Sequence, residues 1–509
     1  MASLVFSNVS FSYPGSSVRV FDAAQFGISE GWTGVIGANG AGKTTLLQLA
    51  TGDLLASSGS IHRPGHVEYC PQRTDYPMDG FARLLSSTEG DAYRLRGQLG
   101  IEEDWLNRWD TLSHGERKRA QIASCLFLRP DLLAVDEPTN HLDQAAKAMV
   151  CESLCRFRGI GLLVSHDREL LDTLCDHSIF VSPPHAVLRG GGYTTAMREL
   201  DQEAELARAA RTRANAERRR LEREAVIRRA HLAKAEKKKS LRGIDPRDSD
   251  ARQKAYAARN TDSGVGRRMH HIEGRVRRAK QDEHALEVVR RNPLGVGLQG
   301  TISARNALFR HPSGNLPLGQ QRSLQLPALL LQPKDRIALI GPNGTGKSTL
   351  VRALISVLDL PPQRFVYIPQ EIDAEASAQV LEEAKALRGD RLGSVMQWVS
   401  RLGSDVQQLL ESSVPSPGEV RKLMLALRMA DEPYLVVMDE PTNHMDLPSI
   451  ECLEKALANC PASLLLVSHD LRFLKALTTS CWELIEGSDS GVTELRIHTS
   501  WPYWENAFA

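Results

Sequence analysis

The stretches GANGAGKTT, Gly37 to Thr45, and GPNGTGKST, Gly341 to Thr349, decide the fold of this chain. Both match the phosphate-binding loop pattern G-x-x-x-x-G-K-[S/T], whose glycines let successive backbone N–H groups turn inward around a triphosphate at a helix N-terminus. Each follows an apolar, strand-like run (WTGVIG or RIALIG) and precedes a helix-like one. One match alone could be a plain glycine turn, whereas two in the same context predict two nucleoside triphosphate sites.

The loops supply the first candidate ligands for ATP and Mg²⁺. Lys43 and Lys347 are predicted to reach the β- and γ-phosphates, and the hydroxyls of Thr44 and Ser348 to bind Mg²⁺. The remaining loop residues predicted to contact ATP are Gly37, Asn39, Gly40, Gly42 and Thr45 in the first copy and Gly341, Asn343, Gly344, Gly346 and Thr349 in the second.

Two further motifs follow the first loop. HVEYCPQ reads as a strand ending in Gln72, a side chain that near a phosphate loop can touch Mg²⁺ and the attacking water. TLSHGERKRAQIASCLF reads as a tight turn that opens a helix, where Ser113 and the backbone of Gly115 are predicted to bind an anion.

Acidic residues and a histidine follow two apolar strands. The apolar strand in DLLAVDEP ends in two acids, Asp136 and Glu137. Asp136 is suited to hold Mg²⁺ through water, and Glu137 is suited to polarise the attacking water. GIGLLVSHD brings His166 to a strand end, where its ring can hold the γ-phosphate and the nucleophile in line.

The second half of the chain repeats these motifs in the same order. Lys43 and Lys347 are 304 positions apart, while the serine, glutamate and histidine motifs each recur after 303. Constant offsets predict two copies of one domain. The second copy contributes Gln370, Ser416, Gly418, Asp439, Glu440 and His469.

Composition limits the class of protein. At 509 residues the chain is long enough for more than one core, and its 42% hydrophobic content is typical of globular proteins. We find no run of about 18 uncharged apolar residues and no signal-peptide pattern at the N-terminus. Eight cysteines occur without a C-x-x-C pair, which favours small buried hydrophobes in a reducing cytosol. The predicted location is cytoplasmic.

These motifs together resemble those of ATP-binding cassette (ABC) ATPases, and two cassettes with DEPTNH in one chain resemble the ABC-F subfamily, whose members act on ribosomes. The resemblance implies an α/β fold with two tandem ABC ATPase (P-loop NTPase) domains joined by a long α-helical hairpin linker. It also implies two ATP molecules sandwiched head to tail. Lys43, Gln72, Glu137 and His166 would face Ser416 and Gly418 across one ATP, and Lys347, Gln370, Glu440 and His469 would face Ser113 and Gly115 across the other.

The chain departs from the family pattern at the serine turns and at the adenine site. LSHGE and PSPGE stand where the family usually has LSGGE or LSGGQ, but each keeps the serine and the following glycine, so ATP contact should survive. Tyr13 could stack on adenine or could be a half-buried strand residue, two equally good interpretations. Phe309 and His311 are both candidates for the stacking residue of the second site.

Residues 194–292 differ in kind from the rest. Met197 to Leu241 is rich in Ala, Arg, Glu and Lys, has no Pro or Gly, and carries a three–four apolar stripe that includes Leu221 and Ala225. A second helix is predicted near Gly266 to Arg291, with a polar tip between them. The predicted domains are therefore 1–193, 194–292 and 293–509.

Charge indicates what this linker binds. Residues 194–292 hold 27 Lys and Arg against 16 Asp and Glu, whereas the remainder holds 36 against 46. A charge run is often only a solvated helix face, but a basic arm between acidic bodies is typical of phosphate-backbone binding. By the ABC-F resemblance the linker would enter the ribosomal exit-tRNA site and contact rRNA and peptidyl-tRNA. The candidate contacts are Lys237, Lys238, Lys239, Arg242, Arg247 and Arg252.

Three functions compete at this point. The first is an ATPase, monomeric with an intramolecular cassette dimer, that acts on the ribosome to dislodge an antibiotic or relieve a stall; the tip sequence resembles the ribosome-protecting branch. The second is the ATP-binding subunit of an ABC exporter that works with a separate membrane protein, in which a long basic linker has no role. The third is a DNA-associated cassette ATPase, which would insert coiled coils and often zinc-binding cysteines within a cassette.

Overall fold

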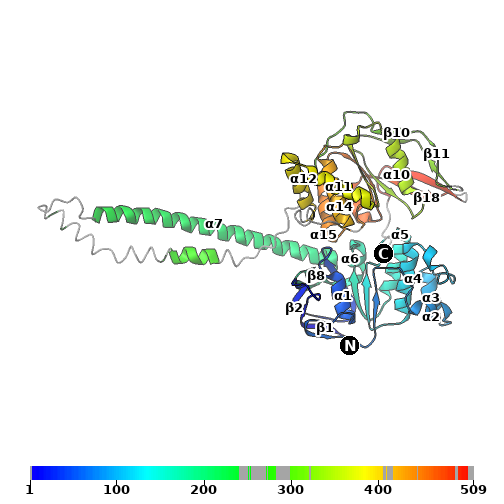
Figure 1. Ribbon diagram of the computed structural model, residues 1–509, viewed down its shortest axis with the longest axis horizontal. Coiled ribbons are helices and arrows are strands. Elements are labelled where there is room, and N and C mark those ends of the chain that lie inside the picture. The colour runs from blue at the N-terminus through cyan, green and yellow to red at the C-terminus, as the bar shows by residue number, and fades with distance from the viewer. Residues whose placement is uncertain are drawn as a thin grey trace. The chain divides into compact units, whose positions relative to one another are not determined.

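The computed structural model describes residues 3–140, 142–239, 250, 253, 271, 273–281, 298–319, 322–404, 409, 416–443, 445–487 and 491–502. They form two compact units, a cassette unit of Met1–Ala196 with Asn292–Ala509 and a linker unit of Met197–Arg291. The cassette unit contains two α/β domains, and the predicted fold class is confirmed (Figure 1). The domain boundaries at residues 193/194 and 292/293 stay a prediction.

The first cassette is built on a parallel sheet. Among the described residues the strand order is β5-β6-β7-β3-β8-β9, and only β9 runs antiparallel to its neighbour. Every residue of β6 and β7 is buried, as expected of parallel strands covered on both faces. The strands are β3 (Gly31–Gly37), β5 (Val67–Cys70), β6 (Leu132–Asp136), β7 (Ile160–Val164), β8 (Cys175–Ser182) and β9 (His185–Gly190).

A second, antiparallel sheet of order β2-β1-β4 belongs to the same cassette, with β1 at Leu4–Phe11, β2 at Phe21–Ile28 and β4 at Ser58–His62. The alternating apolar runs at residues 4–6 and 9–13 predict two short strands, but the structure has the single strand β1. The pairing register of β1 shifts between Phe6 and Val9, and Asn8 has a φ of +48°. This irregularity breaks the alternation of apolar side chains, so one bulged strand looks like two.

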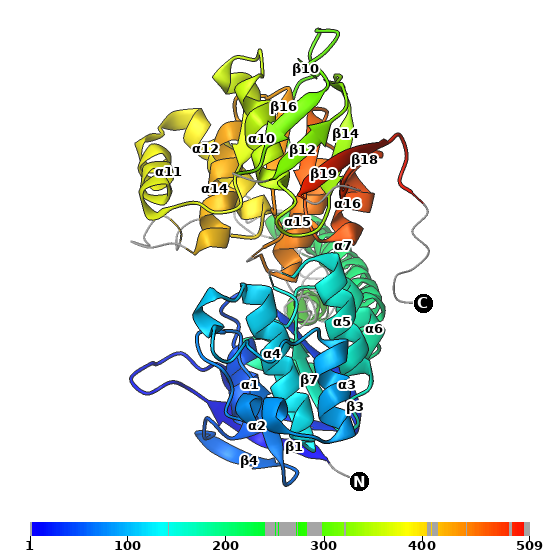
Figure 2. The same ribbon diagram turned by 90° about the vertical axis from the view of Figure 1, so that its right-hand side faces the viewer.

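The helices of the first cassette begin at the predicted motifs. Ser113, Asp143 and Asp167 each cap a helix by accepting a backbone N–H. Ser113, which was predicted to bind ATP, therefore also fixes the start of α4, and Figure 2 shows the helices of this cassette. The helices are α1 (Lys43–Thr51), α2 (Gly80–Ser86), α3 (Gly90–Gln98), η1 (Trp109–Thr111), α4 (His114–Phe127), α5 (Gln144–Cys155) and α6 (Arg168–Leu174).

The second cassette repeats the parallel order as β15-β16-β17-β14-β18, followed by β19, β12 and β11, and β10 pairs with β13. Its strands are β10 (Phe309–His311), β11 (Gly314–Pro317), β12 (Ser323–Leu326), β13 (Leu329–Leu331), β14 (Arg336–Ile340), β15 (Phe365–Ile368), β16 (Leu435–Asp439), β17 (Ser463–Val467), β18 (Ser480–Glu486) and β19 (Val492–His498). Its helices are α10 (Lys347–Ser356), η2 (Pro362–Arg364), α11 (Ala374–Ala386), α12 (Gly389–Arg401), α14 (Pro417–Met429), α15 (Leu447–Ala458) and α16 (Leu471–Leu477).

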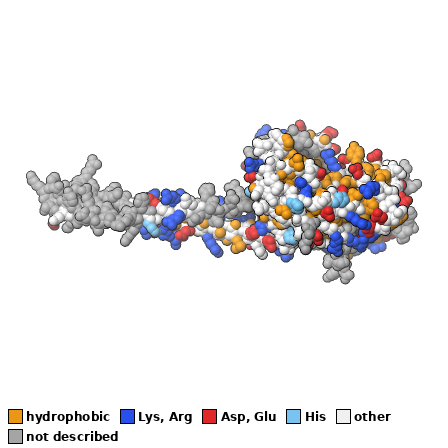
Figure 3. Space-filling model, turned by 90° about the horizontal axis from the view of Figure 1, so that it is seen from below, with side chains coloured by type: hydrophobic (Ala, Val, Ile, Leu, Met, Phe, Trp, Pro, Cys, Tyr) orange, Lys and Arg blue, Asp and Glu red, His pale blue; other side chains and the backbone are white. Residues whose placement is uncertain are grey.

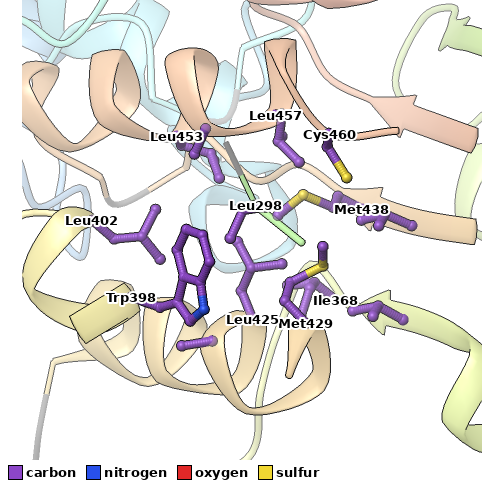
Figure 4. Close-up of a cluster of buried hydrophobic side chains, with 14 of the residues drawn as sticks. Leu298, Ile368, Trp398, Leu402, Leu425, Met429, Met438, Leu453, Leu457 and Cys460 are labelled. Carbon is purple, nitrogen blue, oxygen red and sulfur yellow. The ribbon is translucent and has the colours of Figure 1, made fainter. Parts of the chain in front are cut away.

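A large apolar core fixes these elements around the second sheet. Trp398 of α12, Leu425 of α14 and Leu453 of α15 pack with Met438 of β16 in one continuous cluster (Figure 4). Seven of the eight cysteines are buried without disulfides, but Cys155 is exposed, so the prediction that all are buried is wrong for that residue. The cause is its place at the last position of α5, where the helix leaves the core.

The linker unit contains helix α7 (Tyr193–Lys239), whose first turn belongs to the cassette unit, and a helical segment at residues 273–281. Arg229 pairs with Glu273 at 2.8 Å and Lys280 with Glu222 at 3.5 Å. A step of seven residues back along α7 thus matches seven forward on the other segment, which makes the pair antiparallel. Leu221 and Ala225 of the predicted stripe are buried. Most of the predicted tip lies outside the described residues.

Replacing Leu453 with Ala tests the core. Leu453 is fully buried, so the lost methyl groups and the remaining cavity should lower the free energy of unfolding by about 2–5 kcal/mol. Denaturant unfolding measures the change. The control is Leu330→Ala, which removes the same atoms from a side chain that is 45% exposed. Equal effects of the two substitutions would contradict the described core.

Candidate active site

The two phosphate loops lie at the carboxyl ends of β3 and β14 and lead into α1 and α10. Gly42 and Gly346, just before these helices, have φ values of +97° and +96°. A Cβ atom at Gly42 would lie 2.5 Å from Val20, and one at Gly346 would lie 2.5 Å from Leu318. Both positions therefore require glycine, for backbone conformation and for space.

Each loop lysine folds back over its own loop. Lys43 Nζ donates to the carbonyls of Gly37 at 3.0 Å and Ala38 at 3.1 Å, and Lys347 Nζ donates to those of Gly341 at 2.7 Å and Pro342 at 3.0 Å. Burial lowers the pKa of both ammonium groups, against the opposing effect of nearby carboxylates. The loops thus hold a positive charge where a triphosphate would need it.

Oxygen ligands suited to Mg²⁺ lie beside the loops. Thr44 Oγ1 donates to Asp136 Oδ2 at 2.7 Å. In the second cassette, Asp439 Oδ2 is buried and lacks a hydrogen-bond partner within the described ranges, and burial raises the pKa of this carboxyl. A hydroxyl beside a carboxylate, and an unpaired buried oxygen, fit a hard cation that prefers oxygen ligands.

The two glutamines lie beyond the ends of their strands, whereas the sequence predicted that each would be the last strand residue. β5 ends at Cys70 and β15 ends at Ile368, each two residues before the glutamine expected to end the strand. Gln72 is exposed, while Gln370 is partly buried and its carbonyl accepts a hydrogen bond from Arg421.

A buried glutamate and a histidine are adjacent in each cassette. Glu137 Oε1 lies 3.2 Å from His166 Nε2, and Glu440 Oε1 lies 3.5 Å from His469 Nε2. Both glutamates have a φ of +49°, an uncommon conformation for a residue with a side chain. Burial raises the pKa of Glu137 to about 8 and that of Glu440 to about 7, although the loop lysines oppose the shift.

The histidine of the second cassette lies among polar groups of its own site. His469 Nε2 lies 3.0 Å from Asn343 Oδ1 and 3.3 Å from Lys347 Nζ, so it touches its own phosphate loop. Burial and the charges of Lys347 and Lys147 lower the pKa of His469 well below its usual value. A neutral imidazole at this position can accept a proton from a neighbouring group or donate one to it.

Two aspartates join each phosphate loop to the opposite cassette. Asp446 Oδ2 accepts the backbone N–H of Asn39 at 2.8 Å, and Asp143 Oδ2 accepts that of Asn343 at 3.2 Å. The other carboxylate oxygen of each aspartate caps its own helix, α15 or α5. The contacts are reciprocal, as expected of cassettes arranged head to tail.

The serine turns carry capping boxes. Ser113 Oγ accepts the N–H of Glu116 while Glu116 accepts the N–H of Ser113, and Ser416 and Glu419 repeat this arrangement. Both serines are exposed at the start of their helices, with Gly115 and Gly418 in the first turn. Pro417 is tolerated because it occupies the first position of α14, where its missing N–H would have no helical partner.

The aromatic candidates are now distinguishable. Tyr13 is 44% exposed, and its hydroxyl lies 2.8 Å from Thr45 Oγ1 of the first loop. Phe309 is buried edge-on against Trp482, whereas the ring of His311 bonds the carbonyl of Pro312. Phe309 therefore belongs to the core, which leaves His311 as the candidate in the second cassette.

Comparison with known proteins gives the family. The ABC transporter family model matches residues 21–140 and 324–443. The tylosin resistance ATP-binding protein TlrC of Streptomyces fradiae is 30% identical over 530 residues, covering 90% of this chain and 93% of TlrC. This chain belongs to the ABC-F family of ATP-binding cassette ATPases. The resemblance inferred from the motifs is confirmed.

Other relatives agree with this membership. The ribosome protection protein VmlR of Bacillus subtilis (strain 168) is 28% identical over 493 residues, covering 92% of this chain and 84% of VmlR. The archaeal ribosome recycling factor aABCE1, solved in a complex, matches with a TM-score of 0.63 at 17% identity, covering 96% of this chain and 89% of that one. The latter likeness supports the fold alone.

Sequence reasoning missed two buried cations of this ABC-F ATPase. Lys118 Nζ donates to the carbonyls of Pro71 at 2.6 Å and Asp136 at 2.9 Å. Arg421, at the matching position, donates to the carbonyls of Asn443 at 2.6 Å and of Gln370. Lys118 ties α4 to the end of β6 and to the segment after β5, and Arg421 ties α14 to the segments that follow β15 and β16. The signal was a cation five residues after the serine in both copies.

The raised glutamate pKa values predict a pH dependence. In Glu440→Gln only Glu137 remains as a base, and in Glu137→Gln only Glu440 remains. Because a protonated carboxyl cannot accept a proton, kcat/KM for ATP should rise with pH through the pKa of the remaining glutamate. From values of about 8 and about 7, the midpoint should lie higher in Glu440→Gln.

ATP binding by the Glu137→Gln/Glu440→Gln variant over the same pH range is the control, since it reports the ionisation of ATP itself. Identical midpoints in the two single variants, or a flat profile in both, would contradict the assigned pKa values.

Proposed function

We propose that this ABC-F ATPase hydrolyses ATP at two composite sites and uses the cycle to act on the ribosome through its basic linker. The observation that carries the proposal is the reciprocal contact of Asp143 and Asp446 with the opposite phosphate loops. It supports a composite arrangement because each loop already meets a motif residue of the other cassette.

In each site the residues divide the work. The loop lysine and backbone N–H groups bind the phosphates, and the glutamate takes a proton from the attacking water. The histidine, adjacent to that glutamate, holds the γ-phosphate and the water in line. Ser416 and Gly418 would close the site of Lys43, and Ser113 and Gly115 that of Lys347. Tyr13 would stack on adenine in the first site.

We further propose that each site takes Mg²⁺. Thr44, Asp136 and Gln72 would hold it in the first site, and Ser348, Asp439 and Gln370 in the second. The ion, when bound, would neutralise charge on the β- and γ-phosphate oxygens. When both cassettes bind the terminal phosphates, the two cassettes would close on each other. Hydrolysis would let them open again.

The ribosome is the proposed partner because of charge and kinship. Lys and Arg side chains gather over the described part of the linker unit, while the rest of the chain is acidic (Figure 3). A relative bears the name ribosome protection protein, and others are named for resistance to tylosin and erythromycin. We propose contact with rRNA and peptidyl-tRNA, within the cytoplasm, by a monomer that dislodges a bound antibiotic or relieves a stall.

The alternative is the ATP-binding subunit of an exporter. In the part of the chain that the structure describes, no helix combines the length and apolar character needed to cross a membrane. An exporter would therefore depend on a separate membrane protein, and the linker of residues 194–292 would have no assigned task. Of the candidate RNA contacts, Lys237, Lys238 and Lys239 lie in α7, whereas Arg242, Arg247 and Arg252 lie outside the described residues.

Replacing both glutamates with Gln tests the function. The Glu137→Gln/Glu440→Gln variant keeps the shape of the side chains but loses the base, so ATP should bind without being hydrolysed. The protein should then stay closed, co-sediment with ribosomes in ATP and inhibit translation in vitro. Wild-type turnover by the variant would contradict the roles of the glutamates. Turnover lost without ribosome association would instead favour the exporter.

Salt dependence tests the linker. If it binds RNA phosphates, log affinity for ribosomes should fall linearly with log salt. Replacing Lys237, Lys238 and Lys239 with Gln should reduce that slope by up to about 3 units, according to how many contact phosphate. The control replaces Lys385, Lys455 and Lys475, exposed lysines of the second cassette, and should leave the slope unchanged. Equal slopes in all three proteins would mean that the linker lysines form only a solvated face.

A further inference from the structure

The buried ammonium group of Lys147 joins the segment that contains His166 and Asp167 in the first cassette to the segment that contains His469 in the second. Lys147 Nζ, on α5 of the first cassette, pairs with Asp167 Oδ2 at 2.9 Å and donates to the carbonyl of His469 at 3.2 Å. Asp167 follows His166 in the chain, and His469 belongs to the second cassette. The Lys147 side chain is only 14% exposed, so these partners hold it away from solvent.

The cavity between the two sites shows where this contact acts. Lys147, His166, Asp167, Glu440, His469 and Asp470 all line one pocket. Lys147 therefore lies beside the catalytic pair of the second site, although it comes from the first cassette. Asp167 also accepts N–H groups at the start of α6, so its position does not depend on Lys147 alone.

The contact has no counterpart in the other direction. The position that matches Lys147 in the second cassette is Ile450, which is buried and lines the same pocket. The neighbouring ion pairs, by contrast, run in both directions. Arg168 of the first cassette meets Glu454 at 2.9 Å and Asp470 at 3.6 Å, and Arg472 of the second cassette meets Asp172 of the first at 3.3 Å. The asymmetry is therefore confined to the position of Lys147 and Ile450.

We propose that Lys147 is a positioning residue for the second ATP site, where it holds the backbone of His469 and so keeps the imidazole against Lys347, Asn343 and Glu440. Because the second cassette has Ile450 at the matching position, the first site receives no lysine there, so the two sites are unequal. The catalytic part of this inference rests on the roles proposed above for Glu440 and His469.

Electrostatics supports the same direction. Burial and the charges of Lys347 and Lys147 lower the pKa of His469. Lys147 thus favours a neutral imidazole, in addition to holding the backbone of His469.

The direct test uses histidine-labelled protein and needs no turnover. Lys147→Met keeps an unbranched side chain of similar length, so it removes the charge without leaving a large cavity. The His469 ring signal, assigned by its loss in His469→Gln, should shift in Lys147→Met, while the His166 signal should stay within linewidth. An unmoved His469 signal would overturn the proposal, as would equal shifts of both histidines.

Turnover gives the functional readout. In the Glu137→Gln background, where only the second site hydrolyses, Lys147→Met should lower kcat about 10-fold with little change in the KM for ATP, because Lys147 touches no phosphate. In the Glu440→Gln background the same change should lower kcat less than 2-fold, and this also controls for folding. Lys147→Arg should recover most of the lost rate.

Ile450→Met, at the matching position, is the control and should alter kcat less than 2-fold in both backgrounds. Equal losses from Lys147→Met in the two backgrounds would mean that the lysine only supports the interface, which overturns the proposal. If Glu137→Gln and Glu440→Gln hydrolyse ATP like the wild type, the proposed catalytic bases are wrong. The ring signals then still decide whether Lys147 positions His469.

Discussion

The structure of the cassette unit depends on two aspartates. Each caps a helix of its own cassette and accepts a hydrogen bond from the phosphate loop of the opposite cassette. One carboxylate oxygen of Asp143 caps α5 and the other accepts the N–H of Asn343. Asp446 does the same for α15 and Asn39. A nucleotide that reshapes either loop would therefore disturb a contact made by a helix-capping residue of the opposite cassette. On the function proposed above, these shared atoms would couple nucleotide state to the cassette contact.

Parallel strands explain why so many motif residues converge. The phosphate loop, the acidic pair and the histidine follow β3, β6 and β7, which are neighbours in one sheet and run in the same direction. Their carboxyl ends meet at one edge, where ligands of open α/β sheets usually bind. Burial at that edge also raises the pKa values of Glu137 and Glu440. The same geometry therefore creates the site and adjusts its acid–base chemistry.

The fold was predictable because its signals are local and occur twice. Phosphate loops, apolar strands and capping serines each carry their pattern within a few residues, and the constant offset between copies joined them. Lys118 and Arg421 were missed because their partners are backbone carbonyls, which leave no mark in a sequence. Lys147 was missed because its partners, Asp167 and the carbonyl of His469, come together only in the folded chain. The bulge at Asn8 was missed because two short alternating runs look the same whether or not a strand continues between them.

The difference between Lys147 and Ile450 has a consequence for symmetry. In a dimer of two identical chains, a substitution on one side of a two-fold axis necessarily appears on the other. Both chains would then carry a lysine at the position of Lys147 and Ile450. The two ATP sites of such a dimer would be identical. Tandem cassettes in one polypeptide are free of that restriction. Two cassettes fused in one chain can therefore hydrolyse ATP at different rates. Their two sites can then turn over in a set order rather than together.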